Sequence, residues 1–402
     1  MWGTAWPALR RTFHQPLGEL GVVLLAVTAG GLVTSVTVAA ALRRLGPGPV
    51  LASAGTLGAL AGTLLFVSPT WWVVVVAAGL VGAAGGTIDS GLNAVTAVAG
   101  RTRLLNLLHG AYGIGTALGP LVVTGSLLLS SWRGAYAFLL AADLALALGW
   151  WSTRSRWQES PPRADLRPAG PEPDPRGGGR TASAGELPGS GRAGFGRPGG
   201  RVGGRPSPRP RPRLVVGLGM ALFFAYTGLE VSAGQWSATY ARGPLGLSAA
   251  GAGAVVFLYW GALTTVRLAL AVPRRTPSPL LLARAGTLTA FAGALLVWWG
   301  PGPAPAIVGI GVLGGALAPV FPALVSLTPT RVGAAGAQRV IGWQVGAASV
   351  GGSATAALAG AVLQHAGLSA FGPFLALTAL VVVAASALLE RITGDRPVTS
   401  SG

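Results

Sequence analysis

The sequence predicts an all-α polytopic membrane protein built from two repeated helical bundles, and three observations support this fold class. Of the 402 residues, 51% are hydrophobic and only 10% are charged, whereas soluble domains carry about 25% charged residues. Apolar runs of about 20 residues, the length of a membrane-spanning helix, recur along the chain. Motifs of the first half of the sequence also recur in the second half.

We expect eleven membrane spans, five before a long linker and six after it. They lie at about 17–42, 48–68, 71–98, 104–129, 133–152, 214–240, 247–272, 279–299, 303–328, 335–363 and 369–390. The chain therefore divides into an N-terminal bundle (1–152), a linker (153–213) and a C-terminal bundle (214–402). The linker is rich in arginine, proline and glycine and nearly lacks large apolar side chains, so we expect it to be disordered.

Arginine residues gather in alternate loops, and this pattern predicts the orientation in a cell membrane. The rich set comprises Arg43, Arg44, Arg101, Arg103, the linker arginines, Arg274, Arg275, Arg284, Arg331, Arg339, Arg391 and Arg396. The other loops carry only Arg133 and Arg242. The rich side is expected to be the cytoplasm, which places the C-terminus inside. The odd number of spans then places Arg10 and Arg11 outside, a mild exception to the rule.

Two glycine motifs show that the halves are parallel copies. The stretches "VGAAGGTIDSGLNA" (81–94) and "IGVLGGALAPVFPA" (310–323) share the spacing G-x-x-G-G at an offset of 229 residues. Arg43–Arg44 matches Arg274–Arg275 at an offset of 231. Secondary transporters contain parallel repeats of this kind. The partner of span 214–240 would lie near residues −16 to 10. We therefore expect that a first span has been lost, by truncation or by a wrongly chosen start; a true eleven-span protein is the alternative.

Five motifs carry a resemblance to a known family: "GTIDSGLNA" (86–94), "NLLHGAYGIGTALGP" (106–120), "YTGLEVSAGQW" (226–236), "APVFPALVSLTP" (318–329) and "GWQVGAASVGG" (342–352). With its two parallel halves and long linker, the chain resembles the major facilitator superfamily, and within it the fucose-permease-like branch. The resemblance covers the whole chain except the linker. It implies a two-bundle fold and secondary active transport by a monomer.

Two departures from that family pattern are visible. Arg43 stands where the superfamily's loop between its second and third helices usually has Asp, which weakens any salt-bridge latch there. Fucose permeases use carboxylates in their first and fourth helices. Asp89 resembles the fourth-helix carboxylate, whereas the first helix has no counterpart in this sequence.

Asp89 and Asn93 are the foremost candidates for a polar site inside the membrane. They are four residues apart and so share one helical face. A charged residue within a span costs at least about 2.5–3.5 kcal/mol, so it is expected to face a cavity or a partner. We interpret Asp89 as a proton-coupling carboxylate and Asn93 as a ligand of sugar hydroxyls. A structural carboxylate in a helix contact is the alternative.

Glu230 is the second candidate for proton coupling. Tyr226, Glu230 and Ser237 share one face of span 214–240, so Tyr226 is a candidate substrate contact. Gln235 and Trp236 follow as possible ligands of a sugar, an amide for its hydroxyls and an indole for its ring. The alternatives are a solvated carboxylate near the headgroups and an interfacial tryptophan.

Three further polar residues in the repeated spans are candidate substrate ligands: Asn106, His109 and, as the repeat counterpart of His109, Gln344. A histidine could also relay protons, or simply be satisfied by a neighbouring helix. Asp143 is expected to have a structural role. Arg267 lies seven residues before Arg274, and we expect it to extend to the cytoplasmic face.

These patterns define the function that the sequence favours. There is no cysteine, only three histidines and no nucleotide-binding loop, so we expect no enzyme activity, no cofactor and no metal. Nucleic acid is not an expected partner; protons, a small substrate and the lipid bilayer are. We predict a proton-coupled symporter of a sugar or sugar-like metabolite. "GTALGP" (115–120) partly matches a drug-antiporter motif, so a proton-driven exporter is one alternative and a transport-inactive truncated chain is another.

Overall fold

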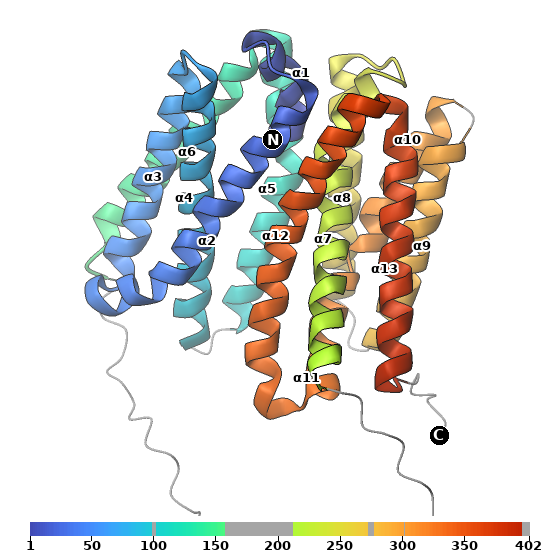
Figure 1. The fold of residues 1–402 in the computed structure, drawn as a ribbon. Helices are drawn as coiled ribbons and strands as arrows, with labels where there is room; N and C mark the ends of the chain where they lie inside the picture. Colours follow the sequence, from blue (N-terminus) through green and yellow to red (C-terminus); the bar gives the residue numbers. More distant parts are fainter. Residues whose placement is uncertain (99–101, 157–211, 272–276, 301, 396–402) are drawn as a thin grey trace, which may run out of the picture. The chain divides into compact units, whose positions relative to one another are not determined.

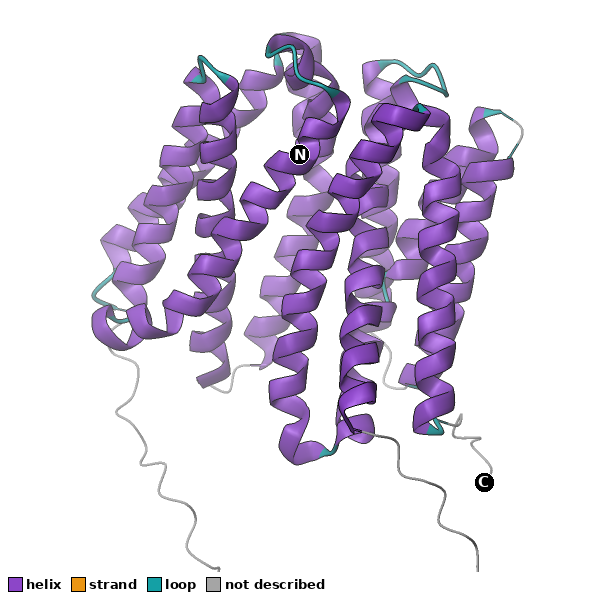
Figure 2. Cartoon of the chain, in the orientation of Figure 1, coloured by secondary structure: helices purple, strands orange, loops and turns teal. Residues whose placement is uncertain are grey.

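The computed structural model describes residues 1–98, 102–156, 212–271, 277–300 and 302–395, and the regular structure among them is entirely helical (Figures 1 and 2). The N-terminal half contains α1 (Trp2–Thr12), α2 (Leu20–Leu45), α3 (Pro47–Val67), α4 (Trp71–Val98), α5 (Thr102–Leu129) and α6 (Trp132–Thr153). The C-terminal half contains α7 (Pro212–Arg242), α8 (Ala249–Ala271), α9 (Pro279–Trp299), α10 (Pro303–Leu317), α11 (Val320–Val332), α12 (Ala334–Ala366) and α13 (Phe371–Thr393). Short 3-10 turns, Leu17–Glu19 and Leu368–Ala370, precede α2 and α13.

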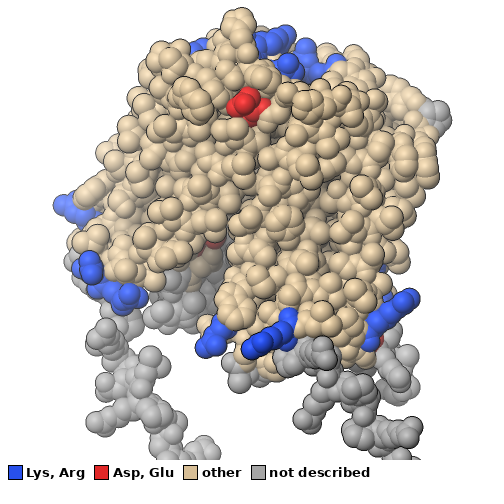
Figure 3. Space-filling view, viewed as in Figure 1, with Lys and Arg blue, Asp and Glu red and all other residues tan. Residues whose placement is uncertain are grey.

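The eleven expected spans are confirmed. Among the described residues, eleven helical stretches are long and apolar enough to cross a membrane, and each corresponds to one expected span. The linker expected at 153–213 lies almost wholly outside the described residues. The lost first span concerns positions before the sequence and stays a prediction. In the space-filling view, arginines gather toward the two ends of the helices, with a largely uncharged surface between them (Figure 3).

One span and one terminus differ from the simple expectation. The span Pro303–Val332 is broken at Ala318 and Pro319, which separate α10 from α11. Residues 2–12 form α1, a helix that the sequence patterns did not indicate, and it packs against α7. At the offset of 231 residues that relates Arg43–Arg44 to Arg274–Arg275, these positions correspond to residues 233–243, at the end of α7. Helix α1 thus lies where the counterpart of that part of α7 is expected.

The helices within each half are held closely by small residues. A methyl group added at Gly82 of α4 would overlap the carbonyl oxygen of Val27 on α2, and one added at Gly86 would lie 2.9 Å from the carbonyl oxygen of Gly31. In contrast, nothing lies within 4 Å of the corresponding position at Gly85. The glycines 82 and 86 therefore allow α2 and α4 to approach, as glycine does in membrane helix pairs. Gly85 instead faces open space.

The two halves meet through α5 with α8, α2 with α12, and α1 with α7. We call the end that contains α1 the upper end, and the end that contains Arg391 near the end of α13 the lower end (Figure 1). At the upper end, hydrogen bonds join the halves. The backbone N–H of Gly3 donates to Gln235 at 2.8 Å, and that of Gly18 donates to Gln364 at 2.8 Å. The hydroxyls of Thr28 and Ser353 are also in contact.

The lower end is open between α2 and α12. In the space-filling view, the surface is hollowed there, between the two halves (Figure 3). The lower half of α2 is correspondingly exposed, with Val36 81% and Val33 64% accessible. The structure therefore describes a conformation that is closed at the upper end and open at the lower end.

Candidate functional site

Glu230, near the middle of α7, is the centre of a polar cluster in the C-terminal half. Its carboxylate accepts a hydrogen bond from the phenol of Tyr226, one turn earlier on the same helix. It also lies 3.5 Å from the guanidinium of Arg267 on α8. The backbone carbonyl of Glu230 accepts a hydrogen bond from the Tyr259 phenol at 2.8 Å. Tyr226 and Tyr259 are fully buried, so Tyr226 fixes the carboxylate of Glu230 and Tyr259 fixes its main chain.

The break between α10 and α11 supplies the remaining acceptors of this cluster. Proline has no backbone N–H, so Pro322 leaves the carbonyl of Ala318, four residues earlier, without its helical donor. Arg267 donates to that carbonyl from Nε at 3.2 Å. The Tyr226 hydroxyl also lies 3.0 Å from the carbonyl oxygen of Leu317. The "APVFP" sequence thus makes main-chain oxygens available to side chains of α7 and α8.

Arg267 therefore has a different place from the one we expected. Its guanidinium instead turns to Glu230 and to the Ala318 carbonyl. The reason is that Glu230 and the free Ala318 carbonyl offer partners within the membrane, so the charge can be satisfied without reaching the headgroups. Its side chain is still 38% exposed, whereas that of Glu230 is 14% exposed.

Asp89 of α4 is the acidic residue of the N-terminal half that faces the same region. It accepts a hydrogen bond from the side-chain nitrogen of Asn93 at 3.0 Å, as expected for residues one turn apart. Asp89 is exposed, and Gly85, one turn before it, faces open space. Gly82 and Gly86, on the neighbouring strip of the same side of α4, pack against α2. Asp89 therefore lies at the open edge of the contact between α2 and α4.

Tyr112 of α5 belongs to the same region, and sequence reasoning missed it. Its phenol is within electrostatic range of Glu230, Asp89 and Arg267. Its side chain is nevertheless 70% exposed, so it borders open space rather than packed protein. The only sequence signal was its position within the "HGAYG" stretch. Asp89, Tyr112, Arg267 and Glu230 together form what we call the central site.

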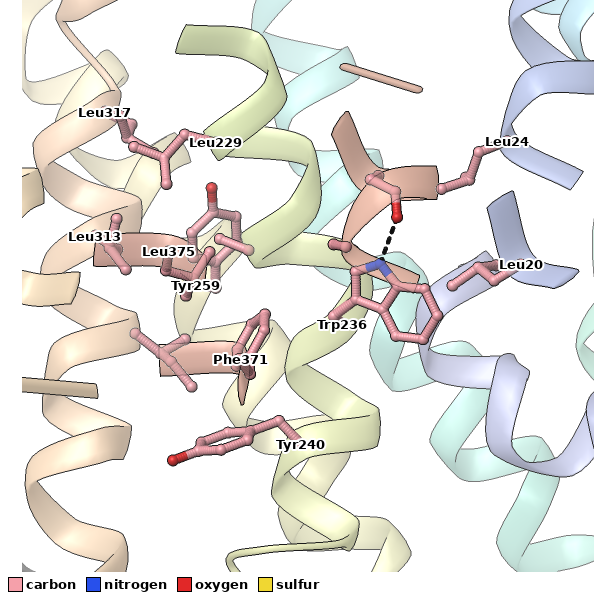
Figure 4. Close-up of a cluster of buried hydrophobic side chains, with 14 of the residues drawn as sticks. Leu20, Leu24, Leu229, Trp236, Tyr240, Tyr259, Leu313, Leu317, Phe371 and Leu375 are labelled. Atoms are coloured by element: carbon pink, nitrogen blue, oxygen red, sulfur yellow. Dashed lines mark hydrogen bonds between the residues drawn. The ribbon is translucent and has the colours of Figure 1, made fainter. Parts of the chain in front are cut away.

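Gln235 and Trp236, which we predicted as substrate contacts, lie in helix contacts instead of on the open side. The Gln235 amide oxygen is bonded to Gly3 of α1. Trp236 is fully buried, and its indole N–H donates to the carbonyl of Ala356 on α12 at 2.8 Å. Leu20 and Leu24 of α2 lie beside its ring (Figure 4). The role of Gln235 and Trp236 in substrate binding stays a prediction. In this conformation, their contacts with neighbouring helices argue against that role.

The other predicted residues are only partly brought together. Gln344 is 5% exposed and accepts a hydrogen bond from Thr328 of α11 at 2.9 Å, away from the central site. The side chains of Asn106 and His109 lie outside the described part of the chain. Asp143 lies in the contact of α6 with α3, against Gly58, which agrees with a structural role. Within the described ranges there is no cluster of acidic and histidine residues able to hold a metal.

The fold and the central site together define a class of protein. Two parallel bundles that meet around polar groups in the middle of the membrane, closed at one end and open at the other, are typical of secondary transporters. The sequence matches the Major Facilitator Superfamily over residues 1–356, and the chain belongs to this family. Among curated proteins, a sequence search found no match.

Solved structures with the same fold include three transporters. One is a peptide transporter POT in complex with sulfate, with a TM-score of 0.64 and 13% identity, covering 94% of this chain and 86% of that one. Another is the E. coli fucose:proton symporter, with a TM-score of 0.55 and 14% identity, covering 96% and 95%. A human organic anion transporter has a TM-score of 0.56 and 16% identity, covering 92% and 82%. At these identities, the similarity shows the fold alone.

Proposed function

We propose that this chain is a proton-coupled symporter of a sugar or sugar-like metabolite, working by alternating access in the cell membrane. The observation that carries the proposal is the position of Glu230, whose carboxylate is held by Tyr226 and Arg267 on the open side of the C-terminal half. Asp89 supplies a second carboxylate from the other half. We further propose that the lower, arginine-rich end is cytoplasmic and that the chain acts as a monomer.

Protonation of Glu230 is the step that couples the proton to movement. The charged carboxylate is stabilised by the Tyr226 hydroxyl and by Arg267. When a proton neutralises Glu230, the attraction to Arg267 is lost, and the guanidinium becomes available to the open space. Protonation of Asp89 removes a second charge from the same space. A site that carries substrate and protons can then close and reopen on the other side.

The described conformation corresponds to one stage of this cycle. Because the lower end is open and the upper end closed, substrate and protons exchange with the lower side. With the lower end cytoplasmic, this is the release stage of an importer. For a proton-driven exporter, the alternative, it would be the loading stage. Asn93 is positioned beside Asp89 to contact a sugar hydroxyl, and Tyr112 could contact substrate from α5.

A second candidate substrate class is an organic anion, and Arg267 favours it. A neutral sugar needs no cation in its site, whereas Arg267 retains 38% exposure beside Glu230. Guanidinium groups bind carboxylates with two parallel hydrogen bonds. A carboxylated metabolite could replace Glu230 on Arg267 once Glu230 is protonated.

Proton movement in vesicles distinguishes symport of a neutral sugar from symport of an organic anion. Neutral hexoses and deoxyhexoses are compared with the matching hexuronic acids, and alkalinisation of the external medium is recorded on addition. A response to neutral sugars that disappears in Asp89→Asn supports sugar symport. A response only to the acids supports the second candidate. No response to either class, in vesicles shown to contain correctly folded protein, would overturn proton-coupled import of both classes and leave export as the alternative.

A further inference from the structure

A second cavity lies at the upper end, away from the central site. It has a volume of about 210 Å³ and is enclosed by α1, α5, α7 and α8, so both halves contribute to its wall. A cavity needs about 10–15 Å³ of volume in this measure to hold one water molecule, so this cavity can hold a small molecule together with several waters. The transport cycle proposed above assigns no role to it.

Two arginines, one from each half, line this cavity. Arg11 is in the last turn of α1, and Arg242 is the last residue of α7. They are 231 residues apart, the offset that relates Arg43–Arg44 to Arg274–Arg275. Arg11 and Arg242 are therefore equivalent positions of the two repeats. In parallel repeats, such positions are related by an axis along the membrane normal, and here both reach the same cavity.

The arginine charges are not neutralised by neighbouring carboxylates. Three ion pairs occur among the described residues, and none involves Arg11 or Arg242. Arg11 donates from Nε to the carbonyl of Pro7 in its own helix. Arg133, another basic residue at the upper end, instead bonds outside its own helix, because its guanidinium donates to the carbonyls of Phe66 and Ser68. Two exposed arginines therefore line the cavity, and the described chain supplies no counter-charge to them.

A buried hydroxyl provides a second, independent sign of a ligand. Thr4 of α1 lines the same cavity and is only 6% exposed. Its hydroxyl has no hydrogen-bond partner among the described residues. Buried polar groups are nearly always paired with protein, water or ligand. Thr4 lines the cavity together with the two arginines, and its hydroxyl can donate to an oxyanion.

The helix dipole alone explains only part of the arrangement of Arg11, Arg242 and Thr4. Arginine in the last turn of a helix is favoured by the helix dipole, which accounts for each residue on its own helix. It does not account for the convergence of both arginines on one cavity, nor for the unpaired Thr4. Interaction with the helix dipoles also does not remove the repulsion between Arg11 and Arg242, which approach each other as the upper end closes.

We propose that the upper cavity binds an oxyanion, a phosphate or carboxylate group, that bridges Arg11 and Arg242 and stabilises closure of the upper end. The anion neutralises both halves at once, and Thr4 donates a further hydrogen bond to it. When the upper end opens, Arg11 and Arg242 separate and the bridge is lost. Anion binding thus shifts the equilibrium toward the conformation described here, because a ligand favours the state that it binds better.

Thermal unfolding of the purified full-length chain in a neutral detergent tests the site. Inorganic phosphate is titrated against chloride at constant ionic strength, so that general screening is unchanged. The variants are Arg11→Gln and Arg242→Gln, with Arg10→Gln as the matched control, because Arg10 has the same charge and does not line the cavity. Phosphate is expected to stabilise the unmodified chain and the control, with at least tenfold weaker apparent affinity in the other two variants.

Conformation is measured in the same samples. The sequence has no cysteine, so a single Ser353→Cys substitution reports on the upper contact between α2 and α12. Phosphate is expected to slow maleimide labelling of this cysteine unless Arg11 or Arg242 has been replaced. If a glutamine variant does not fold, Arg11→Lys replaces it, and weaker binding is expected because the bidentate geometry is lost.

The source of the oxyanion is decided by a second set of samples. The chain is placed in bilayer discs of zwitterionic or anionic phospholipid without added phosphate. Stabilisation by anionic lipid that depends on Arg11 and Arg242, without any effect of free phosphate, identifies a lipid headgroup as the occupant. Equal stabilisation of all variants, or no stabilisation by either source, would overturn the proposal.

Discussion

The carboxylate of Glu230 lies 3.5 Å from the guanidinium of Arg267, and this pair links three segments of the C-terminal half. Glu230 belongs to α7 and Arg267 to α8, and Arg267 also bonds to the Ala318 carbonyl at the α10–α11 break. Removing one partner of a poorly solvated ion pair leaves an uncompensated charge in the membrane. A change in the charge of Glu230 therefore alters the contacts among α7, α8 and the α10–α11 break.

Replacement of Asp89 separates exchange of substrate from its accumulation. We expect Asp89→Asn to fold, because the exposed carboxylate accepts a hydrogen bond from the side chain of Asn93, and the oxygen of an amide can accept it in the same place. Exchange of substrate across the membrane should persist, whereas accumulation driven by a proton gradient should be lost. Both are measured with labelled substrate in vesicles. Full accumulation in this variant would remove Asp89 from the coupling mechanism.

Replacement of Pro322 tests the function of the break between α10 and α11. Pro322→Ala restores a backbone N–H that can bond to the Ala318 carbonyl and so compete with Arg267. We expect transport to fall several-fold while the apparent melting temperature changes little, since Pro322 lies in the first turn of α11, where proline is tolerated. Pro329→Ala, in the same helix, is the control and should leave transport unchanged. Equal transport in both variants would refute a role for the Ala318 carbonyl.

Two glycines of α4 should differ sharply in their tolerance of a methyl group. Gly82→Ala places a Cβ against the Val27 carbonyl, and this overlap should lower stability by about 1–3 kcal/mol. Gly85→Ala meets open space and should have almost no effect on stability. The comparison is made by thermal unfolding in detergent. Equal melting temperatures would show that α2 and α4 are not in close contact.

Trp236→Phe decides between packing and sugar binding. The substitution removes the indole N–H that bonds to the buried Ala356 carbonyl, and an unpaired buried acceptor costs about 1–3 kcal/mol. We therefore expect a lower melting temperature with a KM within about twofold of the original. An unchanged melting temperature with a strongly raised KM would instead favour the direct sugar contact that the sequence suggested.

Helix positions were predictable because they depend on local properties of the chain. A bilayer requires about 20 apolar residues per span, and each such run became a helix. The pairing of Asp89 with Asn93 also followed from helical spacing alone. Helix α1 was missed because its 11 residues, with Pro7 and two arginines, carry no membrane signal. Its position depends on contact with α7.

The partners of individual side chains were less predictable because they come from other helices. Arg267 was assigned to the membrane surface from its distance to Arg274, and only the tertiary fold brings it to Glu230 and Ala318. The amide of Gln235 was equally suited to a sugar hydroxyl and to the backbone of Gly3. Polar residue type identifies a hydrogen-bonding group but not its neighbour.

Glu230→Gln provides the most direct test of proton coupling. Proton uptake by vesicles is recorded after addition of whichever sugar or sugar acid triggers it in the unmodified chain, and substrate exchange is measured in parallel. Glu19→Gln, at the upper end, is the matched control. We predict that Glu230→Gln loses proton uptake but retains exchange, while the control retains both. Proton uptake of unchanged size in Glu230→Gln would contradict proton coupling through Glu230.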